Sequence, residues 1–439
     1  MNELEYWASP EPTIARVRAD VYRDQRRETG HYQRLGDIER LASLGITATR
    51  YPVLWESVAP THPSDRNYAW EDERLRELER FSIEPIVTLM HHGSGPSYTS
   101  LSDPAFPELF ADYAEATARR YPHVARWTPL NEPLTTARFS TLYGVWYPNE
   151  RSDAAFGRAI VNETLAYLLA VRRIRRIVPA ARFMLTEDLQ NFVAGDARAR
   201  DYARHKHERS FLSIELAAGL VTPAHAMWEY LTRVCDISTR TLERIRRLAA
   251  RPDVVGWNYY PNSERYLSTR PDGSFENRSL IDCLDVNLDP KPLLREASRR
   301  LNLPFAISEV HVHGTDRDRA HWLIERHGDV NVLRNEGVDI GAFGAWAAFG
   351  LVDWNSLLRE RNDAIEDGLF ACRPDGGVPE LMLAGDVFRS FRRRSAVSVP
   401  GRGWWDRRDD YNITRPSVTP RATASVRLAT PSLEKIAAT

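Results

Sequence analysis

The sequence of 439 residues lacks several features that would point to particular classes of protein. It has only three lysines and no excess of either charge: 59 basic residues face 60 acidic ones, and the formal net charge is -1. A chain without a basic excess is poorly suited to bind nucleic acid or an anionic membrane surface. We therefore expect neither as a partner.

Cysteine and long apolar runs are also scarce. Cys235, Cys283 and Cys372 are widely spaced and form no Cys-x-x-Cys pair, which argues against a disulfide framework or a thiolate metal site. The segment Met1–Pro12 has no apolar run after a positive charge, as a secretory signal would. No window approaches the roughly 18 apolar residues of a membrane helix. We expect a soluble protein in a reducing, cytoplasmic setting.

Short apolar runs alternate with longer segments of helical period, which is typical of strand-helix units around a parallel sheet. The expected strands are Leu4–Trp7, Ile46–Leu54, Pro85–Met90, Val124–Leu130, Phe183–Leu185, Val254–Tyr259, Pro304–Ser308 and Ile340–Ala345. The expected helices are Gly36–Ser43, Asp72–Phe81, Pro107–Arg120, Ala154–Ile177, Ala197–Ala217, Pro292–Arg299, Arg317–Asn335 and Leu381–Arg392. Eight such units predict an α/β fold, a single (β/α)8 TIM barrel over residues 1–394. Residues 395–439, rich in Ser, Thr, Pro, Ala and Arg, predict an extended or disordered tail.

Polar residues that follow these apolar runs should meet at one mouth of the barrel. Two of them, Glu132 and Glu309, each close a strand-like run. Glycoside hydrolysis needs such a pair: one carboxyl protonates the leaving oxygen, and the other stays ionised and faces the anomeric carbon. Since 177 residues separate the two glutamates, only the fold can bring them together.

The residues around these glutamates resemble the motifs of glycoside hydrolase family 1, the β-glucosidase family. Five segments match in the family's order: Arg50–Pro60 on the second strand, Val87–His92 on the third, Trp127–Pro133 on the fourth, Val254–Tyr260 on the sixth, and Trp346 with Asp353 and Trp354 on the eighth. Five ordered matches are far more specific than any single one, and the resemblance covers about residues 1–394.

The resemblance implies a retaining β-glycosidase that works by double displacement on a small-molecule glycoside or oligosaccharide and needs no cofactor or metal. Glu132 would be the general acid/base, Asn131 would hold the sugar 2-hydroxyl, and Glu309 would be the nucleophile. Arg50 and Tyr260 would orient Glu309. The expected sugar-binding residues are Glu11, His91, Asn258, Trp346, Asp353 and Trp354. Retention would require carboxyl groups about 5–5.5 Å apart.

Three departures from the family pattern affect what can be expected of the site. Ser308-Glu309-Val310-His311 replaces the family's Thr-Glu-Asn-Gly, so the turn after the nucleophile must be built differently. The first-strand Gln is missing, and Glu11 is its nearest substitute. Asp353 replaces a Glu and is one methylene shorter, so a standard glucoside is expected to fit poorly.

Other interpretations remain open from the sequence. His91, His92, His311 and His313, together with Asp353, could be ligands of a metal-dependent hydrolase. A catalytically silent saccharide-binding protein would suit the twelve tryptophans. Transglycosylation would use the same intermediate as hydrolysis. The glycosidase-like part of the chain also resembles the region that some bacterial proteins carry ahead of a nucleotide-sugar reductase-like domain. This likeness hints at a role in the biosynthesis of saccharides or glycosylated metabolites. The sequence does not indicate an oligomeric state.

Overall fold

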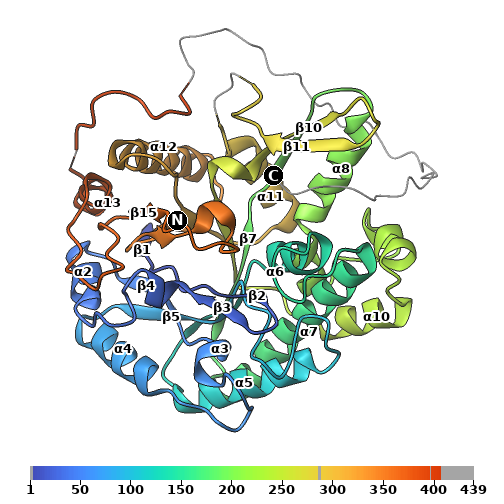
Figure 1. The fold of residues 1–439 in the computed structure, drawn as a ribbon, viewed down its shortest axis with the longest axis horizontal. Coiled ribbons are helices and arrows are strands. Elements are labelled where there is room, and N and C mark those ends of the chain that lie inside the picture. The colour runs from blue at the N-terminus through green and yellow to red at the C-terminus, as the bar shows by residue number, and fades with distance from the viewer. Residues whose placement is uncertain (1–2, 285–287, 396, 407–439) are drawn as a thin grey trace.

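A closed barrel of parallel strands forms the centre of the molecule (Figure 1). The computed structural model of the chain describes residues 3–284, 288–395 and 397–406. The barrel order is β1-β13-β12-β9-β7-β6-β5-β4. Its strands are β1 (Glu5–Ala8), β4 (Ala48–Pro52), β5 (Glu84–His91), β6 (Arg126–Asn131), β7 (Arg182–Asp188), β9 (Val254–Tyr259), β12 (Phe305–Val310) and β13 (Ile340–Ala345). Each coincides with one of the eight apolar runs, so the predicted TIM barrel is confirmed.

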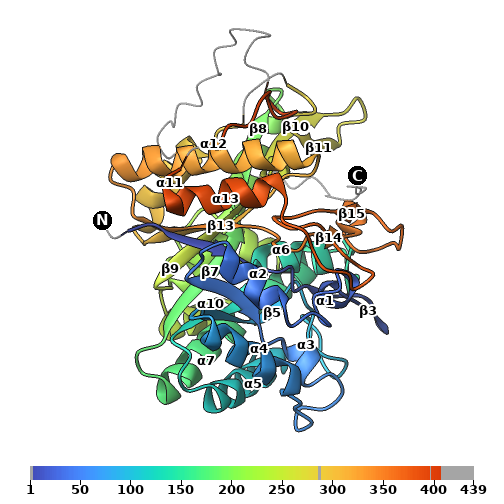
Figure 2. The same cartoon turned by 90° about the vertical axis from the view of Figure 1, so that its left-hand side faces the viewer.

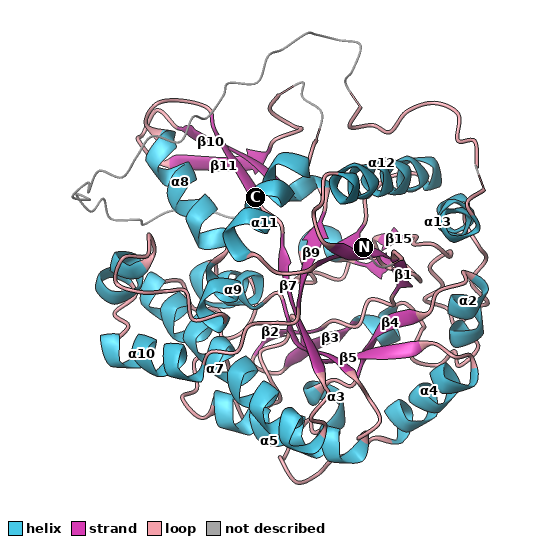
Figure 3. Ribbon diagram, turned by 180° about the vertical axis from the view of Figure 1, so that it is seen from behind, coloured by secondary structure: helices cyan, strands magenta, loops and turns pink. Residues whose placement is uncertain are grey.

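Helices surround the barrel as an outer layer, drawn cyan around the magenta strands in Figure 3. The longer ones are α2 (Asp37–Ser43), α4 (Ala69–Arg80), α5 (Phe106–Arg120), α7 (Asp153–Ile177), α8 (Ala199–Ser210), α9 (Leu212–Ala217), α10 (Thr239–Leu248), α11 (Lys291–Leu301), α12 (Asp316–Asn335) and α13 (Leu383–Arg393). The expected single helix over residues 197–217 is two helices that meet at Phe211. The sequence did not indicate α10, which starts at the Ser238 cap and buries only Leu242 and Ile245.

Helix α7 is long and apolar enough by composition to cross a membrane, which the sequence analysis did not single out. However, 83% of its apolar window is buried inside the structure. Its first turn is capped by the Ser152 hydroxyl, which accepts a hydrogen bond from the amide of Ala155. Buried on most of its faces, α7 has the character of a core helix of the barrel wall.

Small sheets and short helices are inserted in the loops between barrel elements. The sheets are β2 (Ile14–Arg18) with β3 (Val21–Asp24), β8 (Asn191–Ala194) with β10 (Glu264–Thr269) and β11 (Phe275–Ser279), and β14 (Leu351–Val352) with β15 (Ile365–Glu366). The short helices are α1 (Gln25–Glu28), α3 (Trp55–Val58), α6 (Pro133–Ala137), the π-helices Arg138–Leu142 and Tyr230–Val234, and the 3-10 turns Pro261–Ser263 and Trp354–Ser356. Figure 2 shows β3, α1, β14 and β15 together on one side of the barrel. Gln25 joins α1 to β14 through two hydrogen bonds with the backbone of Val352.

The predicted tail begins where α13 ends, since Arg394 is the C-terminal cap of that helix. Residues 397–406 form no helix or strand but pack against α12. The Trp405 ring lies edge-on to Trp322 at 4.9 Å, and its indole donates to Glu325. Residues 407–439, the larger part of the predicted tail, lie outside the described residues, so the domain division stays a prediction.

Candidate active site

The eleven predicted site residues come from strands or loops at the carboxyl end of the barrel. Arg50, His91, Asn131, Asn258 and Glu309 lie within the barrel strands β4, β5, β6, β9 and β12. The others follow strands directly or lie in the adjoining loops; these are Glu11, Glu132, Tyr260, Trp346, Asp353 and Trp354. All are buried except Tyr260 and Trp354, which are partly exposed. The fold therefore gathers into one region residues that are up to 343 positions apart in the chain.

Glu309 is held by two donors from other strands. Arg50 donates from Nη1 to Oε1 at 2.5 Å, and the Tyr260 hydroxyl donates to Oε2. Burial raises the pKa of Glu309, while the Arg50 charge and the Tyr260 hydrogen bond oppose that rise. Both donors stabilise the ionised form, the form that a nucleophile requires.

The turn after Glu309 is anchored by His311 rather than by the family's Asn-Gly. His311 contacts the carbonyl of Trp346 through Nδ1 at 2.9 Å and Glu366 through Nε2 at 3.1 Å. Within β12, the pairing with β9 shifts register between Ile307 and Glu309. Such an irregularity can re-aim a side chain, and here the carboxylate meets both Arg50 and Tyr260.

Glu132 follows β6 directly and has a left-handed backbone, with φ 47° and ψ 58°. This conformation is uncommon and costly for a residue other than glycine. Its amide donates to the carbonyl of Thr186, and Asn258 donates from Nδ2 to Oε1 at 2.6 Å. Burial, followed by the negative charges of Glu309 and Asp188, raises the pKa of Glu132 well above its usual range. A carboxyl that keeps its proton near neutral pH is suited to act as a general acid.

Asn131, the residue before Glu132, is connected to Glu309 through Arg50. Its Oδ1 accepts from Arg50 Nη2 at 2.5 Å and from the Thr186 hydroxyl at 2.8 Å. Its Nδ2 donates to Nε2 of His91 at 3.1 Å. Burial, followed by the charge of His92, lowers the pKa of His91 well below its usual value, so His91 is neutral and can accept this bond.

Glu11 is the nearest substitute for the family's first-strand glutamine, and it lies in the loop after β1. It accepts hydrogen bonds from the Trp346 indole at 2.9 Å and from the amide of Thr13 at 2.8 Å. The rings of His91 and Trp346 stack at 5.3 Å and 6°, and the Arg50 guanidinium lies 5.0 Å from the Trp346 ring. Burial raises the pKa of Glu11 to about 7. Glu11, His91 and Trp346 thus form one continuous wall beside Glu309.

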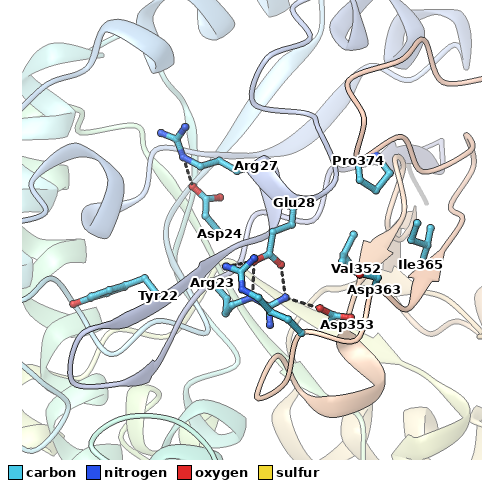
Figure 4. Close-up of a pocket in the computed structure, with 11 residues that line it drawn as sticks. Tyr22, Arg23, Asp24, Arg27, Glu28, Val352, Asp353, Asp363, Ile365 and Pro374 are labelled. Atoms are coloured by element: carbon cyan, nitrogen blue, oxygen red, sulfur yellow. Dashed lines mark hydrogen bonds and ion pairs between the residues drawn. The ribbon is translucent and has the colours of Figure 1, made fainter.

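The carboxylate of Asp353 has three donors within the protein. Arg23, on β3, donates from Nη2 to Oδ2 at 2.8 Å (Figure 4). The amides of Asn362 and Ala364 donate to Oδ1. Asp353 is only 1% exposed, and its contact with a sugar stays a prediction. On its other side is a cavity of about 540 Å³ whose lining includes Arg27, Arg23 and Glu28.

The neighbouring Trp354 packs against aromatic rings near Asn131. Its ring contacts that of His92 at 5.7 Å and that of Trp146 at 6.3 Å. The sequence analysis missed Arg23 and Trp146, which lie in loops before the second and after the fourth barrel strand. The available signal for the hairpin that carries Arg23 was two short runs, Ile14–Arg18 and Val21–Asp24, separated by two residues. The contact of Arg23 with Asp353, however, spans 330 residues.

The histidines of the metal hypothesis do not converge. His91 and His92 face Asn131, whereas His311 contacts Glu366 and His313 packs on Trp404. Across residues 3–284, 288–395 and 397–406, no three His, Cys, Asp or Glu side chains form a group that could hold a metal ion. The arrangement proposed for a metal-dependent hydrolase is therefore absent from the described part of the chain.

Comparison with known proteins decides the family. Residues 15–289, more than half of the chain, match the sequence pattern of the family described as "Glycosyl hydrolase family 1". The chain belongs to glycosyl hydrolase family 1. The resemblance seen in the sequence is confirmed, whereas the link to nucleotide-sugar reductase-like proteins stays a prediction.

Relatives in the family include several glucosidases. β-Glucosidase A of Thermotoga maritima is 23% identical over 359 residues, which are 74% of this chain and 78% of that protein. An aryl-phospho-β-D-glucosidase of Bacillus subtilis is 27% identical over 355 residues, 72% of this chain and 75% of that one. The chain spans about a third of the length of two other matches, a 6-phospho-β-glucosidase of Dickeya chrysanthemi and rat Klotho.

A solved structure of a family 1 β-glucosidase from Thermotoga maritima superposes with a TM-score of 0.74 at 16% identity. The alignment covers 91% of this chain and 99% of that one. At this identity the likeness establishes the fold.

Proposed function

We propose that the protein is a retaining β-glycosidase in which Glu309 is the nucleophile and Glu132 the general acid/base. The observation that carries this proposal is the opposite treatment of two buried glutamates at one barrel mouth. Glu309 receives a cation and a hydroxyl donor, whereas Glu132 receives an amide donor and the field of nearby carboxylates. One carboxyl is thereby favoured as an anion and the other as an acid, the division of labour that the family's double displacement needs.

The reaction proceeds in two steps. The Glu309 carboxylate attacks the anomeric carbon while Glu132 gives its proton to the leaving oxygen, so the glycosidic bond breaks and a glycosyl ester forms. Water then attacks the same carbon, Glu132 takes the proton of that water, and the ester bond to Glu309 breaks. Asn131, tied to Arg50, would face the sugar 2-hydroxyl, and Trp346 with Trp354 would stack against the ring.

We propose β-D-glucosides as the substrate class, with unphosphorylated and 6-phosphorylated sugars both to be tried because relatives of both names occur. The ion pair between Arg23 and Asp353 supports a substrate that makes less use of the acid at this position than a standard glucoside does. A cytoplasmic setting is also part of the proposal. It is supported by the three cysteines, all of which are free.

The test is covalent trapping. The protein is incubated with 2-deoxy-2-fluoro-β-glucosyl and 6-phosphoglucosyl fluorides, and its intact mass and peptides are measured. We expect an adduct of one glycosyl unit that maps to Glu309. Glu309→Ala should abolish the adduct and lower turnover by at least about 10⁴-fold, with partial rescue by azide.

The matched control is Glu163→Ala, which removes another fully buried glutamate, on helix α7. If this variant folds, it should still form the adduct. Normal turnover by the Glu309→Ala variant, or an adduct on a different residue, would contradict the assignment of the nucleophile.

A further inference from the structure

Beside the acid/base lies a second concentration of charge, made of Arg138, Lys206, Arg209 and Tyr143; we call it the basic cluster. Arg138 begins the π-helix that follows α6, and Lys206 and Arg209 lie on α8, next to β10 and β11 (Figure 1). The three cations are 3–5% exposed. Lys206 and Arg209 both donate to the Tyr143 hydroxyl at 3.3 Å.

The positive charge of this cluster is not balanced by nearby carboxylates. Within the described parts of the chain, no Asp or Glu oxygen lies within 4.0 Å of the charged nitrogens of Arg138, Lys206 or Arg209, although many other Arg and Lys side chains pair with carboxylates there. Arg138 instead donates to the neutral Gln190 at 2.5 Å and to Thr135 at 3.0 Å, and its Nε has no hydrogen-bond partner. Burying unpaired cations is costly, so a cluster of them indicates a site for an anion.

Two neighbouring groups reduce the excess of positive charge only in part. Asp188 lies within electrostatic reach of Arg138, but it accepts its hydrogen bonds from Gln190 and Ser263. Although burial alone would raise it, the charges of Lys206, Arg209 and Arg138 lower the pKa of Tyr143 to about 6. Even with Tyr143 ionised, the three cations outnumber the phenolate.

The basic cluster lies on the side of the site where the leaving group would be protonated. Arg138 lies six residues after Glu132, and Gln190, which contacts Arg138, also contacts Asp188 at the end of β7. Asp188 in turn acts on the pKa of Glu132. Arg23 and Asp353 belong to the opposite hairpin side, beside the 540 Å³ cavity. The cluster thus adjoins the residue that would protonate the leaving oxygen.

The rim of the cluster is aromatic and partly open. The Lys206 ammonium lies 5.0 Å from the ring of Tyr202, 5.8 Å from that of Tyr143 and 5.9 Å from that of Phe192. These three rings are partly exposed, whereas the cations beneath them are buried. Aromatic faces around a cation suit a planar aglycone that carries a charged substituent.

We propose that the basic cluster binds an anionic group, a carboxylate or a phosphate, on the aglycone of the substrate. This inference rests on the proposed glycosidase function and adds the chemistry of the leaving group. Arg138, Lys206 and Arg209 supply the charge-assisted hydrogen bonds, and the Tyr143 oxygen is the acceptor that the anion would displace from Lys206.

The test compares two glucosides that differ in charge alone, 4-carboxyphenyl and 4-carbamoylphenyl β-D-glucoside, or the same pair on whichever sugar the trapping experiment identifies. For the wild type we expect kcat/KM to be at least tenfold higher for the carboxylate. In the double variant Lys206→Met with Arg209→Met, the ratio should fall to about one while kcat/KM for the amide stays within about twofold.

The matched control is Arg204→Met, on the same helix, because Arg204 is exposed and pairs with Asp201. It should keep the wild-type ratio. If the double variant does not fold, the single Lys206→Met variant is measured and should lower the ratio at least threefold. A ratio near one in the wild type, or a ratio that persists in the variants, overturns the proposal.

A second measurement needs no turnover and therefore separates this proposal from failure of the glycosidase assignment. Calorimetry measures binding of the two 1-thio-β-glucosides with the same aglycones, and of inorganic phosphate alone. Tighter binding of the carboxylate thioglucoside, lost in the Lys206→Met variant, supports the proposal even if no glycoside is cleaved. Phosphate binding without discrimination between the thioglucosides would show a free-anion site, and no binding of any anion would exclude a site; either overturns it.

Discussion

The two sides of the barrel mouth treat their carboxylates differently. On one side Glu309 is held by Arg50, from barrel strand β4, and by Tyr260, which directly follows barrel strand β9. On the other side Asp353 is held by Arg23, from an inserted hairpin, and by loop amides. Under the proposed function, residues in or next to the barrel strands would carry the chemistry, whereas inserted loops would recognise the sugar. Chemistry and substrate recognition would then be carried by separate parts of the fold.

On the barrel side, Arg50→Met should have the largest effect on activity. This change removes the cation beside Glu309 and also a hydrogen bond to Asn131, and we expect kcat/KM to fall by about 10²–10³-fold, the usual effect of losing a buried electrostatic contact at a reacting centre. The measurement is steady-state kinetics on the substrate found by trapping. Because an arginine near a nucleophile also tunes its pKa, the acidic limb of the pH profile should move to higher pH.

The control for this change is Arg126→Met at the opposite end of the barrel, where Arg126 pairs with Glu5 and Glu84. It should leave kcat/KM within about twofold, since surface ion pairs contribute little. If both variants lost activity to the same extent, the role of Arg50 would be structural and the comparison between the two sides would fail.

The barrel was predictable from sequence because each strand is a short apolar run with a helical segment behind it. Glu132 and Glu309 were predictable because they end such runs within ordered motifs. Arg23 was not, since its meeting with Asp353 depends on how an inserted hairpin folds back across 330 residues. The basic cluster was also missed: the sequence shows Lys206 and Arg209 on one helix, but not that, among the described residues, no carboxylate oxygen lies within 4.0 Å of their charged nitrogens.

The hairpin side is probed by Arg23→Met, which leaves Asp353 with its two amide donors alone. We expect the free energy of unfolding to fall by about 1–3 kcal/mol, because a buried carboxylate loses its charged partner. The preference among glucosides with and without a 6-hydroxyl should shift by up to about tenfold, since Asp353 Oδ2 becomes available. Urea unfolding and kcat/KM on the two sugars measure the two effects.

Arg27→Met is the matched control, because Arg27 lines the same cavity but is largely exposed and pairs with Asp24. Its unfolding free energy should change by less than about 0.5 kcal/mol and its sugar preference should not change. An unchanged preference in the Arg23→Met variant would mean that Asp353 does not face the sugar, and the contrast between the two sides would then concern stability alone.

The last prediction concerns Glu187, which lies beneath the acid/base and accepts a hydrogen bond from the amide of Leu134 at 2.7 Å. Burial raises the pKa of Glu187 to about 8 from 4.5. Between these values the native state holds a proton that the unfolded state has lost, so this group lowers stability as pH rises, by at most about 1.4 kcal/mol per pH unit. Glu187→Gln keeps the acceptor for Leu134 and removes the titration.

Unfolding free energies measured from pH 4.5 to 8 should therefore fall less steeply with pH for the Glu187→Gln variant than for the wild type, and the two curves should lie closest at the acidic end. Glu84→Gln, which changes a half-exposed carboxylate at the other end of the barrel, serves as the control and should run parallel to the wild type. Parallel curves for Glu187→Gln as well would mean that Glu187 is ionised in the folded protein. The negative charge of Glu187 would then act fully on Glu132. The raised pKa of Glu132 would in that case owe more to charge repulsion than to burial.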